Sequence, residues 1–175
     1  MAHEALPSGA IIVPVGSRVT CNPPPMDTDE DYLLLVKDKE AAVKGLLSIG
    51  FEHSTDPKKV AEYEALNEAS QWSFTSLYLG DVNYIVTESE FFFERFLTAT
   101  HVCKTLNLLR KEDRVMVFDA IRGVSFFDKL VPDWKSEGNI RRIKKSGGLF
   151  LEEITDKLSD AAQLKVNQII DPMPF

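Results

Sequence analysis

The sequence predicts an α+β protein in which a mixed sheet packs against helices and the C-terminal part is helical. Two observations indicate this class. Short apolar stretches bounded by Gly, Pro and Asp lie in the first half of the chain, as strands do, whereas apolar residues later recur every three or four positions, as in helices. With 175 residues, 44% of them hydrophobic, the chain is long enough for one domain with a sizeable core. We expect this domain to span 1–175, with a core over about 9–123 and a helical extension over about 124–175.

The first two strands are expected over 9–15 and 31–36. The first, GAIIVPV, is a short apolar run in which Pro14 favours an edge or a strand end. The second, DYLLLV, is almost entirely apolar and therefore expected to be covered on both faces. The segment 37–50 follows with apolar residues on one helical face, and Gly50 suits the left-handed stop after a helix.

A further helix and a hairpin are expected in the middle of the chain. Asp56 and Pro57 occupy the positions that each prefers at the start of a helix, which we expect to run to about Ala69. The segment 71–88 alternates apolar and polar residues, turns near Gly80-Asp81 and resumes as VNYIV. This pattern is typical of a β-hairpin.

Helices are expected from Ser89 onwards. The first has an apolar stripe of about five turns, made by Phe92, Phe96, Ala99, Cys103, Leu106 and Leu109. A shorter helix over KEDRVMVFDAI is expected to bury Val115, Phe118 and Ile121. A basic connector over 139–148 precedes a last helix at roughly 150–169. The residues expected on its inner face are Leu151, Ile154, Leu158, Ala161 and Leu164.

Composition excludes several functional classes. The formal net charge of −7 opposes general attraction to nucleic acid or to an anionic membrane. No apolar run approaches the roughly 20 residues that cross a membrane. The first residues lack a basic stretch followed by an apolar one, so we expect a cytoplasmic protein, in the host cytoplasm if the chain is viral. Cys21 and Cys103 are too few for a disulfide framework or a zinc quartet, and we expect free thiols.

Two acids open the second strand. Asp29 and Asp31 are two residues apart, so on a strand both carboxylates point to the same face and can reach one point in space. Carboxylates held this close repel one another, and a divalent cation between them relieves the repulsion. Oxygen ligands suit Mg²⁺, which takes one or two carboxylates together with substrate phosphate. We expect a magnesium site at these acids.

The loop after the first strand complements these acids. Gly16 permits a tight turn, and the backbone amides that follow, with the Ser17 hydroxyl, can hold phosphate oxygens. Arg18 adds a planar positive group at the same corner. Short patterns of this kind also occur in surface loops whose acids only keep the chain soluble, and both interpretations stay open at the level of the residues.

The segment VGSR…TDEDYLLLV resembles the signature of the nucleotidyltransferase superfamily related to DNA polymerase beta, and residues 80–123 resemble its small, phage-type members. The two segments cover roughly the first 120 residues. The resemblance implies a nucleotidyltransferase-like fold in which Gly16 and Ser17 bind a nucleoside triphosphate and Asp29 and Asp31 hold magnesium. It further implies transfer of a nucleoside monophosphate to a hydroxyl of a protein, RNA or small molecule, with release of pyrophosphate.

The chain departs from this family at one position. Active members usually have a third carboxylate on a neighbouring strand, which helps to deprotonate the attacking hydroxyl; the matching strand here is VNYIV, with Asn83 at that position. An amide cannot act as a base and is a weaker metal ligand than a carboxylate. Asp81, two residues earlier, lies on the same face if the strand begins that early, and otherwise lies in the turn.

Two hypotheses from different classes are consistent with these residues. The first is a magnesium-dependent nucleotidyltransferase. The second is a binding module that keeps the fold and the nucleotide cradle with weakened catalysis and acts, antitoxin-like, on a partner protein. The basic connector, with Arg141, Arg142, Lys144 and Lys145, can guide a polyanion or simply be solvated.

Overall fold

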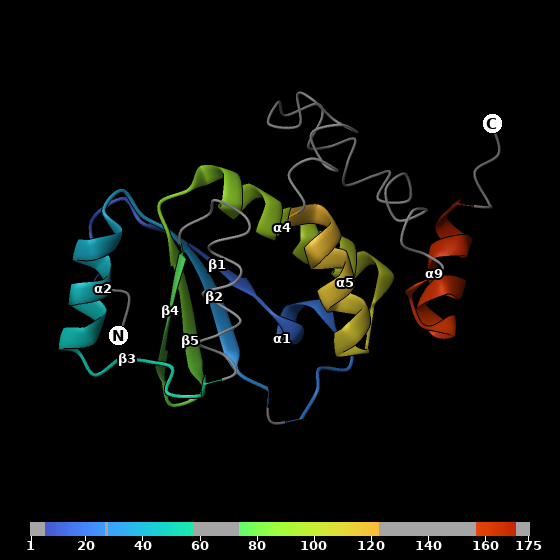
Figure 1. Cartoon of the computed structure of the whole chain (residues 1–175), viewed down its shortest axis with the longest axis horizontal. Helices are drawn as coiled ribbons and strands as arrows, with labels where there is room; N and C mark the ends of the chain where they lie inside the picture. The colour runs from blue at the N-terminus through green and yellow to red at the C-terminus, as the bar shows by residue number, and fades with distance from the viewer. Residues whose placement is uncertain (1–5, 27, 58–73, 123–156, 171–175) are drawn as a thin grey trace. The chain divides into compact units, whose positions relative to one another are not determined.

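The computed structural model describes residues 6–26, 28–57, 74–122 and 157–170 (Figure 1). The chain divides into two compact units. The first comprises Met1–Arg18 and Pro24–Phe93, and the second comprises Val19–Pro23 and Glu94–Phe175. The expected single domain over 1–175 stays a prediction.

Five strands form one mixed sheet among the described residues, together with five helices, which confirms the expected α+β class. The strands are β1 (Ile11–Val15), β2 (Glu30–Leu35), β3 (Glu52–His53), β4 (Phe74–Leu79) and β5 (Val82–Thr87). Their order in the sheet is β1-β2-β5-β4-β3 (Figure 1). Among the described strands only β2 and β5 pair in parallel, and the other three pairs are antiparallel.

This topology brings three chain segments to one edge of the sheet, the edge at which β1 ends and β2 and β5 begin. Val15, at the end of β1, is in register with Asp31 near the start of β2. Asp31 is in turn in register with Asn83 near the start of β5. The turn Gly80–Asp81 precedes β5 directly, and its two-residue length follows from the pairing of Leu79 with Val82. The loop after β1, the acidic entry to β2 and the hairpin turn therefore meet.

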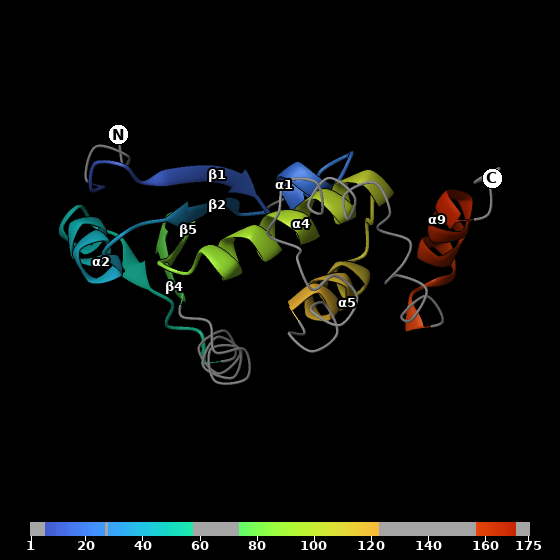
Figure 2. The ribbon, with the colours of Figure 1, turned by 90° about the horizontal axis from the view of Figure 1, so that it is seen from above.

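Helix α2 (Lys39–Ser48) packs on β4 and β5, and Figure 2 shows it beside this part of the sheet. The helix begins at Asp38, whose side chain accepts a hydrogen bond from the Ala41 amide at 3.0 Å. Its last residue is Ser48; Gly50, with φ of 103°, follows in the left-handed region, and the amides of Gly50 and Phe51 donate to the carbonyls of Leu47 and Leu46. This pair of bonds is the Schellman motif, so the expected left-handed stop is confirmed.

The core between α2 and the sheet is apolar and well covered. Its buried residues are Leu34, Val36, Ala42, Leu46, Phe51, Leu77, Tyr84 and Val86. Within it, the Tyr84 ring stacks on Phe51 at 4.9 Å between centroids and meets the edge of Tyr32 at 5.5 Å. Because side chains alternate along a strand, Asp31 and Asn83 lie on the opposite face of the sheet.

The second unit contains most of α4 (Glu90–Leu106), α5 (Lys111–Arg122) and α9 (Asp160–Ile170). The segment 19–23 belongs to this unit because Asn107 and Asn22 exchange two hydrogen bonds, at 2.8 and 3.0 Å. Buried Asp113 accepts from both the backbone amide and the hydroxyl of Ser159, at 2.9 and 2.5 Å. None of the described helices is long and apolar enough to cross a membrane.

Two helical faces differ from expectation. In α5, Ile121 is fully buried, as expected, but Val115 is 41% exposed and Val117 is fully buried instead. Of the helix expected over 150–169, the described part begins at Asp160, because Ser159 caps it and accepts from the Ala162 amide.

The face of α9 is consequently shifted as well. Leu164 is 62% exposed and Ala161 is exposed, whereas Ala162 and Val166 are buried. The segment 150–156, the connector over 139–148 and most of the helix expected from Asp56 to Ala69 lie outside the described residues.

Both cysteines are free, as expected, and both are buried. Burial raises the pKa of the Cys103 thiol to about 12, so this side chain stays protonated at neutral pH and behaves as a core residue.

The two valines of α5 provide a direct test of its buried face. Replacing Val117 by Ala should lower the free energy of unfolding by about 1–3 kcal/mol, because a fully buried side chain leaves a cavity. Val115→Ala removes the same atoms from the same helix but should change stability by less than about 0.5 kcal/mol. Urea denaturation followed by circular dichroism measures both. A larger loss at Val115 would contradict the orientation of α5.

Candidate functional site

Gly16 lies directly against the carboxylate of Asp31. Its φ of 79° is in the left-handed region that glycine adopts without strain. A Cβ atom at this position would lie 2.1 Å from Oδ2 and 2.9 Å from Cβ of Asp31. Glycine is therefore required twice, for the backbone turn and for the close approach of the loop to the acid.

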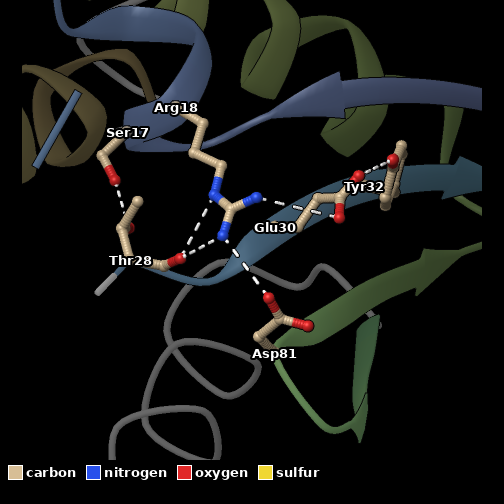
Figure 3. A network of polar contacts seen from close by, with 6 residues as sticks. All are labelled: Ser17, Arg18, Thr28, Glu30, Tyr32 and Asp81. Carbon is tan, nitrogen blue, oxygen red and sulfur yellow. Dashed lines mark hydrogen bonds and ion pairs between the residues drawn. The ribbon is translucent and has the colours of Figure 1, made fainter. Parts of the chain in front are cut away.

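The next two residues attach the loop to the acidic entry of β2. Ser17 begins the short helix α1 (Ser17–Thr20), and its hydroxyl forms a 2.5 Å hydrogen bond with the Thr28 hydroxyl (Figure 3). Arg18 donates from Nε and Nη2 to the Thr28 carbonyl, at 3.2 and 2.9 Å. The loop after β1 and the segment before β2 thus form one connected structure.

Arg18 also contacts two carboxylates. Its Nη2 lies 3.5 Å from Oδ2 of Asp81 in the hairpin turn, and its Nη1 lies 3.8 Å from Oε2 of Glu30 (Figure 3). The backbone joins the same segments, since the Glu30 amide donates to the Asp81 carbonyl at 2.7 Å. The guanidinium therefore connects three segments at this edge of the sheet.

Glu30 has a second partner on the other side. Its Oε1 accepts a hydrogen bond from the Tyr32 hydroxyl (Figure 3). This hydrogen bond, together with burial and the charge of Glu30, raises the pKa of Tyr32. Tyr32 consequently remains a hydrogen-bond donor at neutral pH and orients Glu30 toward Arg18.

Asn83 lies beside Asp31. The residue is only 6% exposed, and Nδ2 donates to Oδ1 of Asp31 at 2.8 Å. The nitrogen of the Asn83 amide is placed toward Asp31 because an ionised carboxylate accepts hydrogen bonds but does not donate them. The other end, Oδ1 of Asn83, is buried and has no hydrogen-bond partner among the described residues. A buried acceptor of this kind is costly unless a donor or a cation satisfies it.

The structure brings most of the sequence-predicted residues together. Gly16 and Asn83, which are distant in sequence, both lie against Asp31, and Ser17 and Arg18 hold the segment that leads to this acid. Asp29 lies one residue before β2, between Thr28 and Glu30, both of which contact Arg18.

This geometry decides two points that the sequence left open. Asp81 lies in the turn and not in the strand, because β5 begins at Val82, and its side chain is 71% exposed. Among the described residues no group of three or more His, Cys, Asp and Glu side chains could hold a metal ion. The side chain that the neighbouring strand β5 places beside Asp31 is that of Asn83, whose Nδ2 donates to Oδ1 of Asp31.

Thr28, Glu30 and Tyr32 were not predicted as site residues. The signal for Glu30 was present, since it lies between two acids, but alternation on a strand directs it away from Asp31. Its partners Arg18 and Asp81 are distant in sequence, so no local pattern indicates the contact.

Comparison of the chain with protein-family models, with curated proteins and with solved structures found no match. The resemblance to nucleotidyltransferases therefore rests on the residues of the two segments that carry it, and it stays a prediction.

Gly9 and Gly16 have similar backbone angles, but only Gly16 lies against another side chain. Substituting each by Ala therefore separates the cost of backbone strain from the cost of steric overlap with Asp31. Gly9 has φ of 89° and open space where a Cβ would be, so Gly9→Ala should cost only the backbone term, about 1–2 kcal/mol. Gly16→Ala should cost about 1–3 kcal/mol more, because the new methyl overlaps Asp31. Urea unfolding of the two variants measures the difference. Equal losses would show that Gly16 does not approach Asp31 closely.

Proposed function

We propose that the protein is a magnesium-dependent nucleotidyltransferase that transfers a nucleoside monophosphate from a nucleoside triphosphate to a hydroxyl of a protein, RNA or small molecule. The observation that carries the proposal is the direct contact of Gly16 with Asp31, beside the buried amide of Asn83. A loop suited to phosphate oxygens and an acid suited to a cation are adjacent only because β1, β2 and β5 share an edge.

The residues at this edge fit a hard cation. Asp29 and Asp31 offer carboxylate oxygens, and Oδ1 of Asn83 is a buried oxygen without a hydrogen-bond partner among the described residues. These are the ligand types that Mg²⁺ prefers, alongside water and phosphate. Magnesium, when bound, neutralises charge on the triphosphate and on the attacking and leaving oxygens.

The protein's own groups would then bind and orient the substrate. The backbone after Gly16 and the Ser17 hydroxyl would hold phosphate oxygens, and Asp29 and Asp31 would hold the cation. Positioning of this kind supplies most of the rate enhancement in phosphoryl transfer.

Magnesium should control nucleotide binding, because the acids at this edge repel a triphosphate in its absence. We expect Mg²⁺ to tighten binding of at least one of the four ribonucleoside triphosphates about tenfold or more, a coupling of about 1.4 kcal/mol. The double change Asp29→Asn with Asp31→Asn should abolish this gain. Glu40→Gln, an exposed acid in the first turn of α2, should leave it intact. Isothermal titration calorimetry with and without Mg²⁺ provides the measurement, and equal affinities in wild type would contradict the proposal.

One observation favours a second function, a binding module with weakened catalysis that acts on a partner protein. Asn83 occupies the position beside Asp31 at which the resemblance implies a carboxylate, and Asp81 contacts Arg18 from the turn. Neither side chain is arranged as a general base next to Asp31. A protein of this kind would bind the magnesium nucleotide and leave it unreacted.

Asn83→Asp distinguishes the two functions. Nucleoside triphosphates labelled at the α-phosphate, with Mg²⁺ and heat-treated cell extract, report transfer as label in protein, RNA or small-molecule fractions. An active wild type should transfer label, lose transfer in Asp31→Asn and gain nothing from Asn83→Asp. A weakened protein should transfer none until Asn83→Asp supplies a carboxylate, a contribution of about 10²–10⁴ in rate where such a base acts. Nucleotide binding with no transfer of label by wild type or by either variant would contradict the nucleotidyltransferase proposal.

A further inference from the structure

The contacts of Arg18 bear on the affinity of the proposed site for its triphosphate, and an inference from them rests on the proposed function. Arg18 is the cation nearest to Gly16 and Ser17 in sequence, and it is already engaged by Asp81 and Glu30. We propose that Asp81 competes with the phosphate chain for Arg18, so that the hairpin turn limits how tightly the site binds its triphosphate.

The contacts of Arg18 fall into two kinds. Two hydrogen bonds to the Thr28 carbonyl, at 2.9 and 3.2 Å, orient the guanidinium. The contacts with the carboxylates of Asp81 and Glu30, at 3.5 and 3.8 Å, are longer, and the side chains of Arg18 and Asp81 are 42% and 71% exposed. The carboxylate contacts are therefore the ones that an incoming anion can replace, because water and salt already weaken them.

Phosphate is the stronger partner for this group. A guanidinium binds phosphate oxygens through paired, charge-assisted hydrogen bonds, which are shorter and stronger than an exposed ion pair at 3.5 Å. Exchange of Asp81 for phosphate thus favours binding, but breaking the ion pair between Arg18 and Asp81 costs free energy and lowers the affinity for phosphate. Removing the Asp81 charge should remove this cost and raise the affinity.

The Asp81 side chain can be replaced without loss of the backbone contacts of the hairpin turn. The backbone carbonyl of Asp81, not its side chain, accepts the hydrogen bond from the Glu30 amide, and Gly80 with φ of 60° provides the turn. Asp81→Asn therefore leaves the hairpin and its attachment to β2 in place. The predicted effect on binding has the opposite sign to that of the double change Asp29→Asn with Asp31→Asn, although both remove negative charge from the same edge of the sheet.

A double-mutant cycle tests the proposal with inorganic tripolyphosphate and Mg²⁺, which present the phosphate chain without a base. Calorimetry at low salt should show about two- to fivefold tighter binding for Asp81→Asn, the range that an exposed ion pair represents. In the Arg18→Ala background the same change should have no effect, because the residue for which Asp81 competes is gone. Glu40→Gln, with the same loss of charge on the exposed first turn of α2, should match wild type.

The outcomes separate this inference from the proposed function. A gain from Asp81→Asn that persists without Arg18 would show simple charge repulsion and overturn the inference, as would unchanged or weaker binding in Asp81→Asn. Binding of tripolyphosphate with the expected cycle, but of no nucleoside triphosphate, would support the inference and contradict the transferase. No binding by wild type or by any variant would overturn both.

Discussion

The pairing register of β1, β2 and β5 is the constraint on which the candidate site depends. Val15, Asp31 and Asn83 form one row across three strands, so the loop after β1 and the starts of β2 and β5 lie at one edge. Because successive side chains point to opposite faces, a slip of one residue in β2 would exchange Asp31 for Glu30 or Tyr32 on this face. The contact between Gly16 and Asp31 would then be lost.

The apolar residues of β2 and β5 hold this register. Leu33 and Leu34 are fully buried on opposite faces of β2, and Val86 is fully buried in β5. A slip would move these side chains out of the positions that bury them, at about 1.5–3 kcal/mol for each apolar side chain exposed. The polar pair Asp31 and Asn83 is thus positioned by burial of its apolar neighbours, and its hydrogen bond offsets part of the cost of burying the amide.

The charged groups at this edge form two sets of contacts. Asp31 faces Gly16 and Asn83, whereas Glu30 faces Tyr32 and, with Asp81, the guanidinium of Arg18. Acidic side chains therefore lie close to both the expected magnesium position and the guanidinium of Arg18. In a chain of net charge −7, an anionic substrate has to arrive with a counter-charge or displace an acid, which connects the proposed magnesium requirement to the proposed role of Asp81.

The sequence by itself determined the fold class, the hairpin around Gly80–Asp81 and the left-handed stop at Gly50 after α2, because turn chemistry and apolar periodicity act between near neighbours. It also indicated Gly16, Asp31 and Asn83 as site residues. Only the tertiary structure decided that these three meet, that Asp81 lies in the turn and that Arg18 binds Thr28, Glu30 and Asp81. It likewise decided that Val117 and not Val115 is buried in α5, and that Ala162 and Val166 and not Ala161 and Leu164 are buried in α9. The physical reason is the same in each case: the partners are separated by 10 to 63 residues, and burial and register, not local propensity, bring them together.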